Sequence, residues 1–565
     1  MKNTCSSHSY FLITSLWTLI SIPVLLLAHY YPLTHYGYNY YGIAYNMWMT
    51  KIFWYPTWLN TINVQKPPLF YWLTNLGWHF FGLHTLVMPA IILISYLLTA
   101  IFTMKTCFVL TKNRQAALLS GVFALLNLTF LKYVTLIRFD IQLTFAFILS
   151  FYALSKIIYE QKQTYWFLFI IGNLMGLLFK GPVILLFTLP ASLLAFLIFP
   201  ENFRSSKYYL EFSISISITI LSGLIWFMLA DYNSHHFYLR TVLSQTLQRF
   251  SHIQPDPNVP NNIISHYHWW YAFGHFFTYI FALFIVPFLL IIPFSMVRIY
   301  SGIRKMDNQL LWYFGLLILI PIFIFSGFIG LVRFRYALPL IPIICILMGY
   351  CFSLTFNSIN KKLENQIYHY YRFVLLLTGI IIILLCAFVP KFKSMWLIFL
   401  PFALGISLIL LTSFSSKTFT KRCLSYVGSC IGFAYIFLIS TFCFLYPYSD
   451  IQKSQKQLVS LRQQQLPIIE INNDATREGW TQYLARDLTI PLISEDKGEK
   501  LWLKKNQNFW VVYTTSFDRV RNFRALIYPL EYPLTNFSKI PILMPVSVYH
   551  QLLAFKNPMH AINLQ

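Results

Sequence analysis

Apolar runs long enough to cross a membrane recur along most of this chain, and they limit its fold more than any other feature. A helix needs about 20 mainly apolar residues to span about 30 Å of hydrocarbon. The mean hydropathy is +0.59, and 57% of the residues are hydrophobic against 11% that are charged. These values lie outside the usual range of soluble globular proteins. The sequence therefore predicts an integral membrane protein built from helices.

About thirteen membrane spans are expected from these runs, separated by short polar or basic breaks. No small-residue cleavage site follows the first run, which therefore predicts a retained helix rather than a removed signal peptide. The expected spans lie near residues 11–30, 87–110, 115–134, 140–159, 165–179, 181–199, 210–230, 269–296, 310–329, 337–356, 373–390, 396–413 and 423–446.

Short basic loops indicate the orientation of the chain in the membrane. With a cytoplasmic N-terminus, "TKNR", "RSSK", "RIYSGIRK", "NKKLENQ" and "SSKTFTKR" all fall on the cytoplasmic face, as the positive-inside rule requires. Two long loops, 31–86 and 231–268, and the tail 447–565 then lie on the opposite, translocated face. The expected location is a cell membrane that the chain crosses many times.

The tail differs in character from the rest of the chain. Its segments "LPIIEIN" and "NFWVVYTTS" predict strands, and "DATREGWTQYLARDL" predicts a helix that Asp474 caps. The expected fold is an all-α polytopic membrane domain over 1–446, followed by a small soluble α/β domain over 447–565. All eight cysteines precede this tail without a CxxC pair, so neither a disulfide framework nor a cysteine metal site is expected.

A lysine stands before two prolines in "VQKPPLFYWL", in the first long loop. Proline disfavours the α region for the residue before it and is tolerated at the first helical positions. Lys66 should therefore be extended, with Pro67 and Pro68 opening an aromatic, amphipathic helix of the membrane interface. An ammonium group at the positive end of a helix suits a phosphate. The alternative is a lysine that only reaches from the interface to water.

Further basic motifs fall on the same translocated face, in a chain whose formal net charge is +24. Each of them alone would serve as an interfacial anchor to anionic membrane lipid. Together they predict a shared anionic ligand. They are Arg138 with Asp140 in "LIRFDIQLTF", Lys180 in "FKGP", Arg249 in "QTLQRF", and Arg333 and Arg335 in "RFRYALPLIP".

The order of these motifs resembles that of the membrane-embedded GT-C glycosyltransferases. Within them, residues 11–350 are similar to the bacterial aminoarabinose-to-lipid A transferases and the protein O-mannosyltransferases. The resemblance implies an inner-membrane enzyme that takes a sugar from a polyprenyl-phosphate carrier and passes it to a glycolipid or protein acceptor on the periplasmic side. It implies no cofactor and no nucleic acid partner. By motif, Lys66, Arg249 and Tyr336 would hold the carrier phosphate.

The sequence departs from that family in the first loop. The family's Asp-Glu-x-Arg-Tyr reads Tyr-Gly-Tyr-Asn-Tyr here, so only Tyr40 keeps its place, and no Asp or Glu precedes Asp140. Gln65 replaces an acidic residue, and Ser-Gln-Thr at 244–246 replaces a His-Glu-His run. Since these side chains are poor zinc ligands, no metal is expected there.

Asp140 is the tentative catalytic residue, because it is the first acidic residue of the chain and opens a span at the expected face. It would act as a base, bind a sugar hydroxyl or hold a basic side chain. Alternatively it pairs with Arg138 or caps a helix. His266 and His268 in "SHYHWWY" are two further candidates for a general base, or else amphipathic anchors at the interface.

Three functions remain open. The first is a glycosyltransferase that uses a lipid-phosphate sugar donor; an acceptor phosphate would need no base, so basic side chains alone could stabilise the departing phosphate. The second is a relative that binds the carrier without transfer, as the missing carboxylate suggests. The third is a transporter or flippase, which the few ionisable residues inside the spans and the lack of an inverted repeat disfavour.

Overall fold

The computed structural model describes a large part of the chain. The described residues are 7–30, 37–58, 61–62, 66–203, 206–236, 238–239, 300, 302–328, 334–355, 468–472, 492–494, 510–515 and 540–545.

Two compact units make up the chain. The first comprises Met1–Leu26, Val64–Phe70 and Val87–Ser440. The second comprises Leu27–Asn63, Tyr71–Leu86 and Thr441–Gln565. The separation at residue 446 expected from the sequence stays a prediction.

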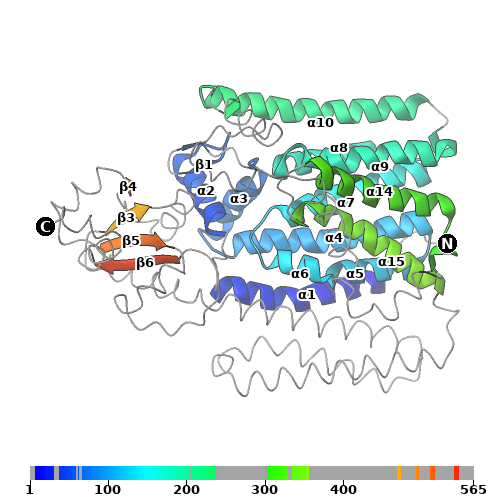
Figure 1. The fold of residues 1–565 in the computed structure, drawn as a ribbon, viewed down its shortest axis with the longest axis horizontal. Coiled ribbons are helices and arrows are strands. Elements are labelled where there is room, and N and C mark those ends of the chain that lie inside the picture. The colour runs from blue at the N-terminus through cyan, green and yellow to red at the C-terminus, as the bar shows by residue number, and fades with distance from the viewer. Residues whose placement is uncertain are drawn as a thin grey trace, which may run out of the picture. The chain divides into compact units, whose positions relative to one another are not determined.

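The first unit is a bundle of helices, and its long helices run side by side (Figure 1). Four segments of the described part are long and apolar enough to cross a membrane: Val87–Thr111, Asp140–Glu160, Lys207–Asn233 and Arg335–Leu354. The helices are α1 (Ser7–Tyr30, whose last residues belong to the second unit), α4 (Val87–Thr111), α5 (Arg114–Leu125), α6 (Leu128–Val134), α7 (Asp140–Glu160), α8 (Tyr165–Lys180), α9 (Leu185–Ile198), α10 (Ser206–Asn233), α14 (Asn308–Phe328) and α15 (Ile341–Thr355). Among the described residues, they are joined by the 3-10 segments η1 (Pro182–Ile184), η2 (Pro200–Phe203) and η6 (Phe334–Leu340).

Helix α7 lies in the middle of this bundle and packs against α4, α8, α9 and η6. Its closest neighbour is α8, because Gly172 has no side chain: a Cβ there would lie 2.3 Å from Ser150 Oγ. Asn173 of α8 donates to Ser150 Oγ of α7 at 3.4 Å and to Phe169 O of its own helix at 2.9 Å, and it accepts from Thr188 Oγ1 of α9 at 2.7 Å. These bonds satisfy a fully buried amide inside an apolar bundle.

The span expected over residues 115–134 is two helices instead of one. Helix α5 ends at Leu125, and α6 begins at Leu128. Between them, the Asn127 side chain accepts hydrogen bonds from the backbone N–H groups of Thr129 and Phe130. An asparagine in this position starts a new helix, so the continuous apolar composition concealed a helix boundary.

The second unit contains part of the first long loop. Helix α2 (Gly37–Thr50) is followed by a short antiparallel hairpin of β1 (Thr57–Trp58) and β2 (Thr61–Ile62). Most of α3 (Leu69–Phe81) also belongs to this unit, and its amphipathic sequence was the basis for expecting a helix here. The helix begins one residue after Pro68, so both prolines precede it.

A four-stranded sheet is described in the tail, in the order β4-β3-β5-β6. Strand β3 (Ile468–Asn472) is parallel to both β4 (Leu492–Ser494) and β5 (Trp510–Thr515), whereas β6 (Ile540–Pro545) is antiparallel to β5. The sequence predicted β3 and β5 but missed the two outer strands. The helix expected from Asp474 lies outside the described residues.

Candidate functional site

The candidate site lies at the N-terminal end of α7, in the first unit. Asp140 is the first helical residue, and Phe139 occupies the cap position without a side-chain cap bond. Asp140 is therefore not the helix cap. As expected, it opens the helix two residues after Arg138, which is half-buried.

Asp140 forms an ion pair with Lys180, the last residue of α8. Both side chains are buried, with 4% and 5% of their surface exposed. Gly181 follows with a φ of 82°, a left-handed conformation that favours glycine, and it ends α8. Asp140 thus holds a basic side chain, one of the roles expected for it, and the partner is Lys180.

Tyr336 brings segment η6 to the same place. The Lys180 Nζ lies 4.5 Å from the centre of the Tyr336 ring, and the Arg335 Cζ lies 5.7 Å from it. Both distances are within the range of cation–π attraction. The packing of η6 against α7 holds this arrangement in place.

The Lys66 segment reaches the same end of α7 through two aromatic rings. Phe70 and Phe139 meet edge to face with ring centres 4.9 Å apart, and each side chain is almost fully buried. Lys66 itself is half-buried in a bend, four residues before Phe70. Because Phe139 stands between Arg138 and Asp140, this contact joins the "KPP" motif to the "RFD" motif.

The structure thus brings together Asp140, Lys180 and Tyr336 by direct contact, and the segments of Lys66, Arg138 and Arg335 by packing. Tyr40 belongs to the second unit, where its ring lies 6.5 Å from that of Tyr71. The remaining expected site residues and replaced metal positions lie outside the described residues: Arg249, Arg333, His266, His268, Gln65 and 244–246.

One polar residue near this site was missed from the sequence. Gln142 lies in the first turn of α7 and is fully buried. Neither its Nε2 nor its Oε1 has a hydrogen-bond partner among the described residues. The signal in the sequence was a glutamine two residues after Asp140, at the start of a long apolar segment.

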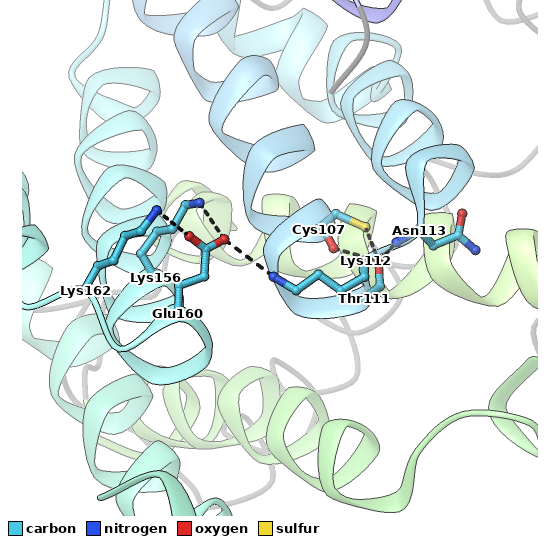
Figure 2. A network of polar contacts seen from close by, with 7 residues as sticks. All are labelled: Cys107, Thr111, Lys112, Asn113, Lys156, Glu160 and Lys162. Carbon is cyan, nitrogen blue, oxygen red and sulfur yellow. Dashed lines mark hydrogen bonds and ion pairs between the residues drawn. The ribbon is translucent and has the colours of Figure 1, made fainter. Parts of the chain in front are cut away.

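A second polar network lies at the other end of α7, which is about 30 Å away for a helix of this length. Figure 2 shows three lysines around the Glu160 carboxylate. Lys156, Lys162 and Lys112 place Nζ at 2.7, 3.0 and 3.5 Å from its oxygens. The hydrogen bond to Glu160 raises the pKa of Lys162. This network ties the ends of α4 and α7 to the start of α8.

Among the described residues, no group of three His, Cys, Asp or Glu side chains is placed to hold a metal ion. At the candidate site the buried Asp140 carboxylate pairs with one cation, Lys180. Lys180 and Asp140 compensate each other's charge within this site.

Part of this chain is similar in sequence to a known protein family. Residues 65–226 match the family described as "Dolichyl-phosphate-mannose-protein mannosyltransferase". An uncharacterized protein from Aquifex aeolicus (strain VF5) is 27% identical over 252 residues, which cover 42% of this chain and 48% of that protein. The chain thus matches about half the length of this curated relative.

Solved structures of ArnT from Cupriavidus metallidurans match almost the whole chain. The structure bound to undecaprenyl phosphate has a TM-score of 0.60 at 15% identity and covers 94% of this chain and 98% of ArnT. The apo structure also has a TM-score of 0.60, at 14% identity, covering 95% and 99%. The chain therefore has the polytopic helical fold of the GT-C glycosyltransferase ArnT, and its residues 65–226 are similar to the protein mannosyltransferases.

Proposed function

We propose that the chain transfers a sugar from a polyprenyl-phosphate-linked donor to an acceptor of the cell envelope, a lipid A-type glycolipid or another. The reaction would take place on the periplasmic face of the inner membrane, with a cytoplasmic N-terminus and a periplasmic tail. The observation that carries the proposal is the meeting of the Lys66, Arg138, Lys180 and Arg335 segments at one end of α7. The likeness to ArnT, solved with undecaprenyl phosphate, supports a lipid phosphate as the anion.

Transfer breaks the bond between the anomeric carbon of the sugar and the carrier phosphate oxygen, and forms one from that carbon to an acceptor oxygen. The electron pair of the broken bond goes to the phosphate, which leaves as polyprenyl phosphate. Preorganised cations stabilise this developing charge, and each such donor contributes about 2–4 kcal/mol by analogy with oxyanion-hole donors. Lys66, Arg138 and Arg249 are the side chains we assign to this role, and Tyr336 would help to position the phosphate.

Asp140 is poorly placed to act as a base while it is paired. Protonating its carboxylate would leave the buried Lys180 ammonium without its counter-charge, which is costly in a buried site. A positioning role for the pair fits better, with Asp140 holding Lys180 beside Tyr336. An anionic acceptor such as a phosphate needs no deprotonation, so this arrangement favours it over a hydroxyl acceptor.

A second function is favoured by the same observations. No Asp or Glu precedes Asp140, and Asp140 itself is committed to Lys180. A chain that binds the polyprenyl phosphate carrier without transferring a sugar would need only the cations. The two functions differ in transfer and agree on carrier binding.

Both functions are tested with purified protein in lipid nanodiscs. We expect undecaprenyl phosphate to bind, and Lys66→Ala and Arg249→Ala each to weaken this binding by at least tenfold. Lys132→Ala is the matched control, because Lys132 is an exposed lysine of the short helix α6. Unchanged binding in both site variants would show that the phosphate site is wrong.

Transfer is then measured with a panel of undecaprenyl phosphate sugars and labelled envelope glycolipids. A single productive donor whose transfer Lys66→Ala abolishes supports the enzyme and eliminates the binding-only alternative. Carrier binding without transfer across the panel supports the alternative.

A further inference from the structure

Gln142 is an unusual residue for the core of this bundle. Its side chain is 0% exposed, yet neither polar atom has a hydrogen-bond partner among the described residues. Asn173 is equally buried, but its amide is bonded to Phe169 O, at 2.9 Å, and to Thr188, at 2.7 Å. An unbonded buried amide is unfavourable and calls for an explanation. The bundle satisfies one amide and leaves the other without a partner.

The position of Gln142 relates it to the candidate site. Residues three apart on a helix share a face. Phe139 lies three residues before Gln142, and its ring centre is 4.9 Å from that of Phe70 in the Lys66 segment. The backbone of Leu143 donates to Phe139 O at 3.0 Å, so Phe139 already follows the helical path. Gln142 therefore lies on the face of α7 that meets the Lys66 segment, in the turn that Asp140 opens.

The chemistry of the amide selects among ligands. Its NH2 group donates and its carbonyl oxygen accepts. A phosphate offers only acceptors and would leave the carbonyl unbonded, whereas an ammonium offers only donors and would leave the NH2 unbonded. A hydroxyl both donates and accepts, so a pair of sugar hydroxyls satisfies the whole amide.

We infer that Gln142 binds hydroxyl groups of the sugar on the lipid-linked donor and so helps to select that sugar. This inference rests on the proposed carrier-binding function and adds the residue that reads the sugar. Because Gln142 is enclosed, the sugar reaches it when side chains around it rearrange. The Phe139–Phe70 contact is the point at which the Lys66 segment and this face of α7 would separate.

Replacing Gln142 with methionine tests two effects of the amide: its cost to stability when it is buried without a partner, and its hydrogen bonds to the sugar. Methionine has a similar volume and no hydrogen-bonding amide, so the lipid-free variant should melt at a higher temperature than the parent. Binding is measured for bare undecaprenyl phosphate and for undecaprenyl phosphates that carry a hexose, a pentose or an amino sugar. We expect the parent to bind at least one sugar-bearing carrier more tightly than the bare carrier. Gln142→Met should bind the bare carrier normally. Its affinity for the sugar-bearing carrier should be about tenfold lower than that of the parent, which corresponds to the loss of about 1.4 kcal/mol of hydrogen bonding.

Asn173→Leu is the matched control, because it removes a buried amide that is already bonded. This variant should melt at a lower temperature and keep the same preference for the sugar-bearing carrier. Gln142→Leu repeats the test if Gln142→Met does not yield folded protein, with the same expected losses.

Three results would overturn the inference. They are an unchanged sugar preference in Gln142→Met, a parent that gains no affinity from any sugar on the panel, and a variant that also loses the bare carrier. Failure of the parent to bind bare undecaprenyl phosphate would instead contradict the proposed function, and the inference would fall with it.

Discussion

Lys180 and Asp140 form a buried ion pair although 40 residues separate them in the sequence. Removing one partner of such a pair leaves an uncompensated charge, which destabilises a protein by about 3–5 kcal/mol. Asp140→Asn and Lys180→Met should each lower the free energy of unfolding by about this amount. The double variant should recover most of the loss, because no lone charge remains. Thermal melting of the four proteins checks this, and a double variant no more stable than either single one would contradict it.

The contact between Phe70 and Phe139 should control carrier binding through the Lys66 segment. Phe70→Leu keeps an apolar side chain but loses the edge-to-face contact, which contributes about 0.5–1.5 kcal/mol. We expect the affinity for undecaprenyl phosphate to fall severalfold, with a small change in melting temperature. Phe80→Leu is the control on the same helix, since Phe80 is 70% exposed, and it should bind the carrier normally. Equal binding by both variants would separate Phe70 from the site.

Gly172 should be required for the close approach of α7 and α8. In Gly172→Ala the new Cβ would lie 2.9 Å from Ala146 O and from Ser150 N as well as close to Ser150 Oγ. Overpacking of this kind costs about 1–3 kcal/mol, so the melting temperature should fall. Gly315→Ala in α14 meets nothing within 4 Å, so the better helix propensity of alanine should keep or raise its melting temperature. An unchanged melting temperature of Gly172→Ala would mean that α7 and α8 can move apart at little cost.

The pH response of Lys162 should depend on Glu160. The hydrogen bond from Lys162 to this carboxylate raises the pKa of the lysine, and Glu160→Gln should return that pKa toward its ordinary value. Because the pKa is raised in the folded protein, the stabilisation is present below the unfolded-state pKa of lysine and disappears as the pH rises through the folded-state pKa.

Titration of Lys162 by NMR of the reductively methylated protein measures this change. Glu211→Gln is the control, because it removes a carboxylate that lies 3.7 Å from a different lysine, Lys207. It should leave the Lys162 titration where it was. An unchanged pKa of Lys162 in Glu160→Gln would mean that the contact is absent in solution.

Composition and hydropathy sufficed to predict the helical membrane class and the placement of the long helices α4 and α7. The expected spans at 87–110 and 140–159 agree with α4 and α7 to within one residue at each end. The break at Asn127 was missed, because hydropathy does not register a side chain that accepts hydrogen bonds from the backbone of the residues that follow it. The prolines after Lys66 indicated α3 correctly but placed its start too early by two residues.

The candidate site was harder to predict, because its partners come from distant segments. The motifs grouped Asp140, Lys180 and Tyr336 in one expected site, and the structure places these three side chains in contact. Their roles stay predictions. Which cation would pair with Asp140 depends on the packing of α8 against α7, which sequence spacing cannot give. Gln142 was overlooked because one amide in an apolar segment has no periodic pattern.

Lysines from outside the helix hold α7 at both termini, with Lys180 at Asp140 and Lys112 and Lys162 at Glu160. A piston-like displacement of α7 in either direction would stretch ion pairs at one terminus or compress them at the other. The helix should therefore keep its position when a ligand binds. Adjustments to an incoming ligand would then fall on the Lys66–Phe70 stretch and on η6, which carry the other halves of the site.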